Sequence, residues 1–185
     1  MIRVRAWIFG VFALLSAGVA EAERVSEPYA KVGDWEITAE NHKECGMLRS
    51  FAGSGADKFH LLVLYDAQRK VAALSWATSE PQPPTGASLD LYLTFTRKGS
   101  PLNEKWGSQP FQFAKLVGGY SFTHVFGSAD SNRFLRDLAS SDTIGLWLGP
   151  SLMTGLPLDA SDAVIKLRAC ASKIAESDAS GRQQK

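Results

Sequence analysis

The chain has 185 residues, of which 45% are hydrophobic and five are tryptophan, enough apolar material for one domain with a single core. Its 20 basic and 19 acidic residues give a formal net charge of +1. Removing the leader described below takes away Arg3, Arg5 and Glu21 and leaves 18 residues of each sign. A neutral mature chain without a basic cluster lacks the electrostatic footprint of a nucleic-acid-binding protein or of a polybasic membrane patch.

Residues 1–22 have the three parts of a cleavable secretory signal peptide. After two arginines, an unbroken apolar run covers Ala6–Val19, which is shorter than the roughly 20 residues that span a bilayer. Cleavage is predicted between Ala22 and Glu23, with a second candidate site after Ala20. The alternative, a retained N-terminal anchor, requires a longer run and stop-transfer charges. We expect a periplasmic or secreted protein without stable membrane insertion after cleavage.

Downstream of the leader, apolar runs with the period of a half-buried strand alternate with short polar turns. Residues 23–33 are polar, contain Pro28 and are expected to form a lead-in segment. Residues 97–110 are expected to form a loop. The expected strands of the first two thirds of the chain are Asp34–Thr38, Cys45–Phe51, Phe59–Tyr65, Val71–Ala77 and Ser88–Thr96, with one or two more within Phe111–Val125.

The clearest alternation of the whole chain lies in Ser88–Thr96. Every second residue from Leu89 to Phe95 is large and apolar, so this set is expected to face the core. Asp90 and Thr94 lie on the opposite face and are expected to be more exposed. The core-facing set comprises Leu89, Leu91, Leu93 and Phe95.

The last third of the chain changes to a helical period. Ser131–Ala139 begins with a residue that favours helix N-termini and places its large apolar side chains on one stripe, which predicts a short helix. The run Thr143–Leu148 and residues 152–158 are expected to pair as strands. A second helix is expected to begin near Asp159 or Ser161.

These elements indicate one domain of mainly β class over residues 34–176. We expect a β-sandwich-like arrangement of roughly eight strands in antiparallel meanders, with two short helices in the C-terminal third; an α+β fold is the alternative. The breaker-rich segment Pro81–Gly86 separates two meanders but is too short to separate domains. Residues 177–185 are small and polar and are expected to form a disordered tail.

The only two cysteines, Cys45 and Cys170, both lie in the mature chain. In an oxidising compartment, an even pair without metal-like spacing predicts one disulfide bond. Closing a loop of this length contributes roughly 4–5 kcal/mol in the chain-entropy model, as an upper figure. The alternative, a redox-active or metal-binding pair, is disfavoured because there is no C-x-x-C motif and no neighbouring histidine.

Local signatures of catalysis, metal binding and cofactor binding are missing from the sequence. There is no G-x-S-x-G or H-E-x-x-H motif, and no serine is followed three residues later by lysine. Because His42, His60 and His124 are isolated from one another, we assign no catalytic residue, metal ligand or cofactor site. Trp106 is the candidate for ligand binding, since it lies in a loop-like stretch where periodicity does not require burial. The alternative for Trp106 is core packing, as for most large aromatic residues.

The order of several features resembles a known family. A signal peptide, the strand Gly33–Ile37, an early cysteine and β-meanders are followed by a short helix over Phe134–Ala139 and a strand pair. The segment Leu156–Leu158 then leads to a terminal helix that contains Leu167–Cys170. This order resembles the invasion-associated locus B family, and more closely a set of exported alphaproteobacterial proteins whose last helix ends in a cysteine.

The chain also departs from the invasion-associated locus B pattern. That family usually has a cysteine two residues after the Trp-x-x strand and a second internal cysteine pair near a Gly-Cys step, and neither is present here. The resemblance implies an exported envelope protein and supplies no catalytic residue.

Three classes of function remain open. The first is a non-enzymatic binding or accessory protein of the bacterial cell envelope, which the missing chemical motifs favour. The second is an accessory component of an envelope secretion or assembly system, whose partners would be other envelope proteins. The third is an enzyme whose site is assembled from non-local residues, which a deep cleft with convergent polar groups would indicate.

The leader predicts the N-terminus of the mature protein. Because the cleavage motif ends at Ala22, mass spectrometry of the exported protein should find Glu23 as the first residue. A chain that begins at Met1 and stays in the membrane fraction would contradict this assignment.

Overall fold

The computed structural model describes residues 26–41, 43–52, 58–79, 88–97, 104–116 and 119–182. The predicted signal peptide and its cleavage site at Ala22 and Glu23 lie outside the described residues. Within them, ten strands and two helices form. The strands are β1 (Ser26–Val32), β2 (Trp35–Glu40), β3 (Glu44–Ala52), β4 (Lys58–Asp66), β5 (Val71–Thr78), β6 (Ser88–Thr96), β7 (Glu104–Leu116), β8 (Gly119–Phe126), β9 (Thr143–Leu148) and β10 (Ser151–Pro157).

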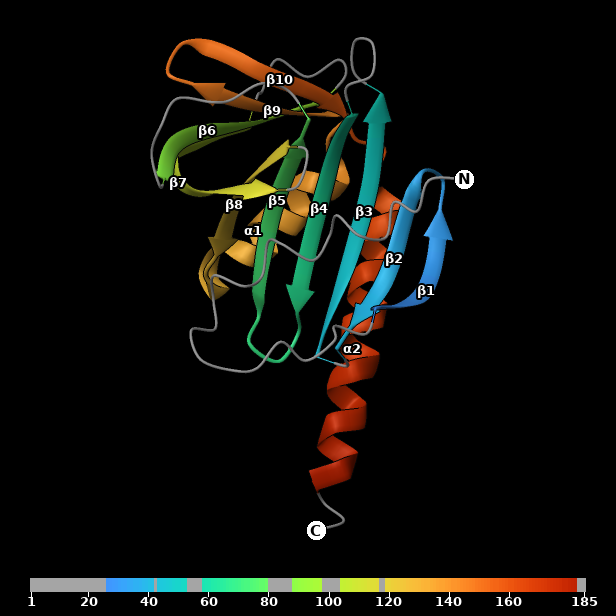
Figure 1. The fold of residues 1–185 in the computed structure, drawn as a ribbon. Helices are drawn as coiled ribbons and strands as arrows, with labels where there is room; N and C mark the ends of the chain where they lie inside the picture. Colours follow the sequence, from blue (N-terminus) through green and yellow to red (C-terminus); the bar gives the residue numbers. More distant parts are fainter. Residues whose placement is uncertain are drawn as a thin grey trace.

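All ten strands belong to one antiparallel sheet in the order β1-β2-β3-β4-β5-β8-β7-β6-β9-β10. The sheet is not closed, and β1 and β10 are its edges. It bends strongly, so that β6, β9 and β10 run across one end of β4 and β5 (Figure 1). The mainly β class and the antiparallel pairing are confirmed, but the strands form one bent sheet instead of two facing sheets.

The two helices, α1 (Ser128–Ser140) and α2 (Ser161–Arg182), cover one face of the sheet (Figure 1). Helix α2 contacts β1 to β4, and α1 contacts β5 and β8. The last turns of α2 pass beyond the ends of the strands (Figure 1). Neither helix combines the length and the hydropathy needed to cross a bilayer.

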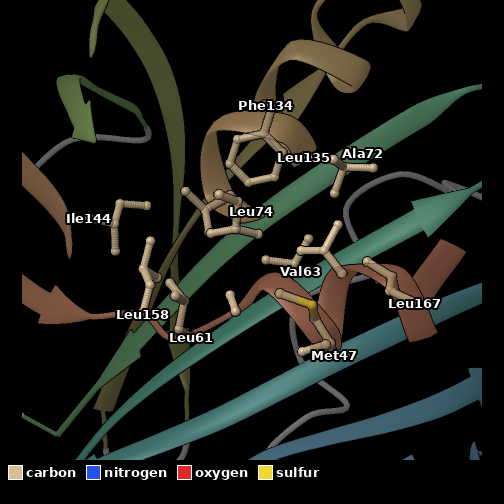
Figure 2. Close-up of a cluster of buried hydrophobic side chains, with 14 of the residues drawn as sticks. Met47, Leu61, Val63, Ala72, Leu74, Phe134, Leu135, Ile144, Leu158 and Leu167 are labelled. Carbon is tan, nitrogen blue, oxygen red and sulfur yellow. The ribbon is translucent and has the colours of Figure 1, made fainter. Parts of the chain in front are cut away.

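The core lies between the helices and the sheet face that they cover. Alternate side chains of the central strands point toward apolar side chains of both helices (Figure 2). Leu91, Leu93 and Phe95 are buried and Asp90 is exposed, which confirms the predicted faces of β6; Leu89 is half-buried. The core residues labelled in Figure 2 are Met47, Leu61, Val63, Ala72, Leu74, Phe134, Leu135, Ile144, Leu158 and Leu167.

Strands β4 and β5 are apolar on both faces, which explains why their sequences read as nearly continuous apolar runs. Leu62 and Leu64 point away from the helices and form a second, smaller cluster with Ala73 and Leu48. Such runs are typical of strands that are buried on both sides.

The predicted disulfide bond between Cys45 and Cys170 is confirmed. Its Cα atoms are 6.1 Å apart, within the usual range, and both residues are almost completely buried. Because Cys45 lies on β3 and Cys170 on α2, the bond joins the first half of the sheet to the last helix across 125 residues.

Three sequence-based expectations need correction. The lead-in segment 23–33 contains a strand, because residues 26–32 pair with β2, and Pro28 is tolerated at a register irregularity on the sheet edge. The expected loop 97–110 contains the first half of β7, in which Gly107 lies where the pairing with β6 slips. Residues 177–182 of the expected tail 177–185 continue α2, so this helix is not short.

The disulfide bond should contribute to stability equally through either cysteine. We expect Cys45→Ala and Cys170→Ala each to lower the free energy of unfolding by about 2–4 kcal/mol, since both reopen the same loop. Urea unfolding followed by circular dichroism measures this. A reductant should lower the stability of the wild type and leave both variants unchanged; clearly unequal losses would contradict a purely structural role.

Candidate functional site

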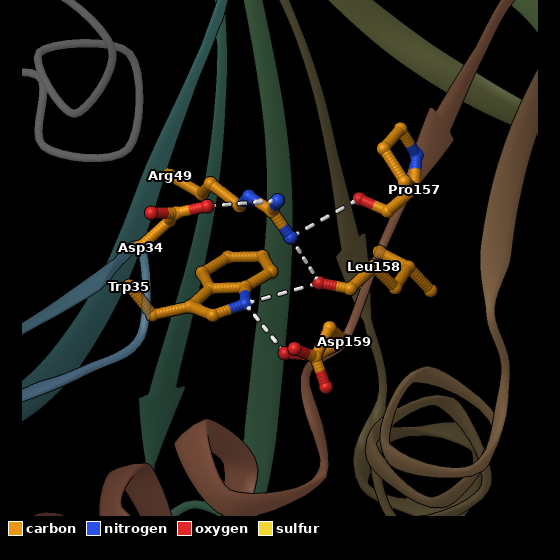
Figure 3. Close-up of polar contacts among 6 residues, drawn as sticks. All are labelled: Asp34, Trp35, Arg49, Pro157, Leu158 and Asp159. Carbon is orange, nitrogen blue, oxygen red and sulfur yellow. Dashed lines mark hydrogen bonds and ion pairs between the residues drawn. The ribbon is translucent and has the colours of Figure 1, made fainter.

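A half-buried arginine connects strand β3 to the end of β10 and the segment that leads to α2 (Figure 3). The Nη1 atom of Arg49, on β3, donates hydrogen bonds to the carbonyl oxygens of Leu158 and of Pro157, the latter at 3.3 Å. Its Nη2 atom lies 3.1 Å from the Asp34 carboxylate. The guanidinium also lies over the ring of Phe51, 4.8 Å from its centroid.

Trp35 adds a second connection to the same segment (Figure 3). Its indole Nε1 donates to the carbonyl oxygens of Leu158 at 3.2 Å and Asp159 at 3.1 Å. Asp159 has a φ of 46°, a left-handed conformation that reverses the chain before α2 begins. We call the contacts of Trp35 and Arg49 with residues 157–159, together with the Asp34–Arg49 ion pair, the Arg49 staple; its hydrogen bonds hold the backbone of residues 157–159 in place.

The second polar cluster surrounds Asp137, a buried residue of α1. Its carboxylate accepts a hydrogen bond from Trp106 Nε1 at 3.1 Å. Arg133 and Arg136 each place Nε 3.6 Å from this carboxylate, and the Arg133 guanidinium also lies 4.4 Å from the Trp106 ring centroid. The two arginines therefore balance the charge of the Asp137 carboxylate, and this carboxylate accepts the hydrogen bond of a core tryptophan.

The expectation that Trp106 lies in a loop is wrong. Trp106 belongs to β7, is 3% exposed, and makes edge-to-face contacts with Phe126, Phe134 and Phe95. Its surroundings therefore match the core-packing alternative. Nothing in its neighbourhood in the sequence indicates the buried acceptor, because Asp137 is 31 residues away.

The two histidines that the structure describes, His60 and His124, make separate polar contacts. The Nδ1 atom of His60 lies 2.9 Å from the Ser50 hydroxyl, and that of His124 lies 3.0 Å from the Pro110 carbonyl oxygen. His42 lies outside the described residues. Among the residues that the structure describes, no group of three or more potential ligands is arranged to hold a metal ion.

An apolar hollow opens at the end of the sheet where β10 crosses β4 and β5. Its volume is about 50 Å³, and Met153 and Thr154 of β10 form one side of it. Side chains from β4, β5, β6, β8 and β9 form the remainder, so the bend of the sheet creates the hollow. We call it the β10 hollow, and its lining residues are Phe59, Trp76, Thr78, Leu91, Phe122, Leu146, Met153 and Thr154.

The two edges of the sheet differ in how they meet solvent. Strand β1 has Glu27, Pro28 and Lys31 along its exposed length, the residue types that discourage pairing with another chain. Strand β10 has no charged residue, and Leu152 and Met153 are 50% and 39% exposed. The β10 hollow thus lies beside the uncharged edge.

No single sequence pattern could have located the β10 hollow. Its lining comes from six strands, and its polar members, Thr78 and Thr154, have no motif around them. Among the predicted site residues that the structure describes, the fold brings Cys45 and Cys170 together.

Comparisons with protein-family models, curated proteins and solved structures find no match to this chain.

Substitutions at Asp137 should show that its carboxylate is structural. Asp137→Ala leaves the buried Trp106 N–H without an acceptor, so we expect a loss of about 3–5 kcal/mol in unfolding free energy. Asp137→Asn keeps an acceptor and should lose roughly half as much. Urea unfolding measures both, with the exposed Asp130→Ala on the same helix as control. Equal losses for Asp137→Ala and Asp130→Ala would refute the assignment.

Proposed function

We propose that this chain is an exported, non-enzymatic binding or accessory protein of the bacterial cell envelope. The buried Cys45–Cys170 disulfide is compatible with an oxidising compartment outside the cytoplasm, and the leader sequence supports export to the periplasm or beyond. The order of features shared with the invasion-associated locus B family supports the same location.

The observation that carries a binding role is the β10 hollow. It is open to solvent, its lining is mostly apolar, and it adjoins the exposed side chains of Leu152 and Met153. A volume of about 50 Å³ is far below the roughly 300–1,000 Å³ of small-molecule sites. It accommodates part of a larger partner, which favours macromolecular binding over turnover of a small substrate.

The polar clusters around Arg49 and Asp137 support a non-enzymatic role in a different way. The Arg49 guanidinium bonds to backbone carbonyls, and the Asp137 carboxylate binds the Trp106 indole beside two arginines. The buried hydroxyl of Ser131 donates to the carbonyl oxygens of Phe126 and Gly127 and accepts the N–H of Ala72. These groups, which have the chemistry of catalytic residues, hold the fold together.

Site-specific photo-crosslinking in an exporting bacterial host tests the binding role. A photoreactive amino acid at Met153 should yield discrete crosslinked products in the periplasmic or secreted fraction. The same amino acid at Tyr29 should yield no such products, because Tyr29 lies on the charged edge β1, away from the hollow. The two positions are matched in exposure, 38% for Tyr29 and 39% for Met153. Matching patterns at both positions would contradict the proposed binding site.

A further inference from the structure

We propose that β10 accepts an extended, uncharged segment of another polypeptide as an eleventh strand, with one aliphatic side chain of that segment in the β10 hollow. The inference rests on the proposed binding function and names the chemical class of the partner.

The first argument is the backbone of β10. In the part of the chain that the structure describes, β10 pairs with β9 on one side and has no strand on the other. The outward N–H and C=O groups of such an edge can form hydrogen bonds with the backbone of another extended chain. When a peptide adds to a sheet as a strand, these backbone hydrogen bonds provide the affinity.

The second argument is charge. Sheet edges that avoid pairing have charged side chains, proline or bulges, and β1 has all three, with Glu27, Pro28, Lys31 and an irregular register after Pro28. Strand β10 shares the bulge, at Met153, but its seven residues contain no charge. Its one proline, Pro157, is at the end of the strand, where Arg49 binds the carbonyl oxygen. A neutral, partly apolar edge fits a segment that is itself uncharged.

The third argument is the position and size of the hollow. The pairing of β10 with β9 slips between Leu152 and Thr154, which leaves Met153 as the extra residue of a bulge, and Met153 and Thr154 both line the hollow. A strand added to β10 would present alternate side chains to that side of the sheet. At about 50 Å³ the hollow is much smaller than a cavity of about 150 Å³ that holds benzene, so it suits a small aliphatic side chain.

A second copy of this chain fits the edge less well. A symmetric pairing of two β10 strands uses at most seven residues a side, whereas stable protein–protein interfaces use roughly 20–30, so a second copy would need further contacts beyond β10. A flexible segment can instead combine the strand pairing with insertion of a side chain into the hollow.

Titration of the isotopically labelled mature protein with synthetic peptides, followed by NMR, tests the inference. The probes are short peptides in which threonine alternates with valine, leucine or isoleucine, added up to about 1 mM. We expect amide shifts in β10 and in the hollow-lining strands for at least one aliphatic peptide. Peptides with glutamate in place of the aliphatic residue, or with N-methylated backbone amides, should bind at least about tenfold more weakly.

Two protein variants give the matched control. Met153→Lys places a charge at the hollow and should weaken binding of the best peptide by at least about tenfold. Tyr29→Lys, at nearly the same exposure on the opposite edge, should not change the affinity of that peptide. The spectrum of each variant reports whether it is folded. Absence of shifts with every aliphatic peptide, or equal binding of the N-methylated ones, would overturn the inference. Crosslinks at Met153 without peptide binding would refute only strand addition, whereas loss of both would also refute the proposed binding function.

Discussion

The carbonyl oxygen of Leu158 is the point on which the rest of the structure depends. It accepts hydrogen bonds from the Trp35 indole and the Arg49 guanidinium, so it joins the β2–β3 hairpin to the start of α2. The two ends of the sheet are not paired with each other, and this contact links β2 and β3, near one end, to the residue that follows β10, at the other end. The disulfide at Cys170 then attaches the next turns of α2 to the same hairpin. Together these contacts hold α2 against the sheet.

The same connection determines what β10 presents to solvent. Arg49 fixes the strand at Pro157, its last residue, while Leu152 and Met153 near its beginning remain exposed. The hollow therefore lies between a fixed end and a free edge, at the place where the bend brings β10 over Phe59 and Trp76. Stability and the proposed binding surface thus share one structural cause, the return of the chain after β10 to the β2–β3 hairpin.

The sequence-based expectations were wrong mainly where glycine or proline lies inside a strand and was therefore assigned to a loop. Gly107 and Pro110 resemble loop residues, yet in β7 the glycine coincides with a slip in pairing, and the proline lies before the stretch that pairs with β8. Pro28 likewise lies on an edge strand, where its missing N–H is not needed. Trp106 appeared free because its acceptor, Asp137, belongs to another element.

The sequence by itself determined the buried face of a strand and the disulfide bond. Alternation in Ser88–Thr96 identified the buried face of β6, because side chains of a strand point to opposite sides, and two cysteines allow only one intramolecular pairing. Tertiary structure alone decided that the strands form one bent sheet, that Arg49 and Trp35 meet the Leu158 carbonyl, and that six strands enclose a hollow. Every residue has a backbone carbonyl, so composition and periodicity do not show which one a side chain will bind. The order of strands in a sheet depends on contacts between distant residues and leaves no local pattern in the sequence.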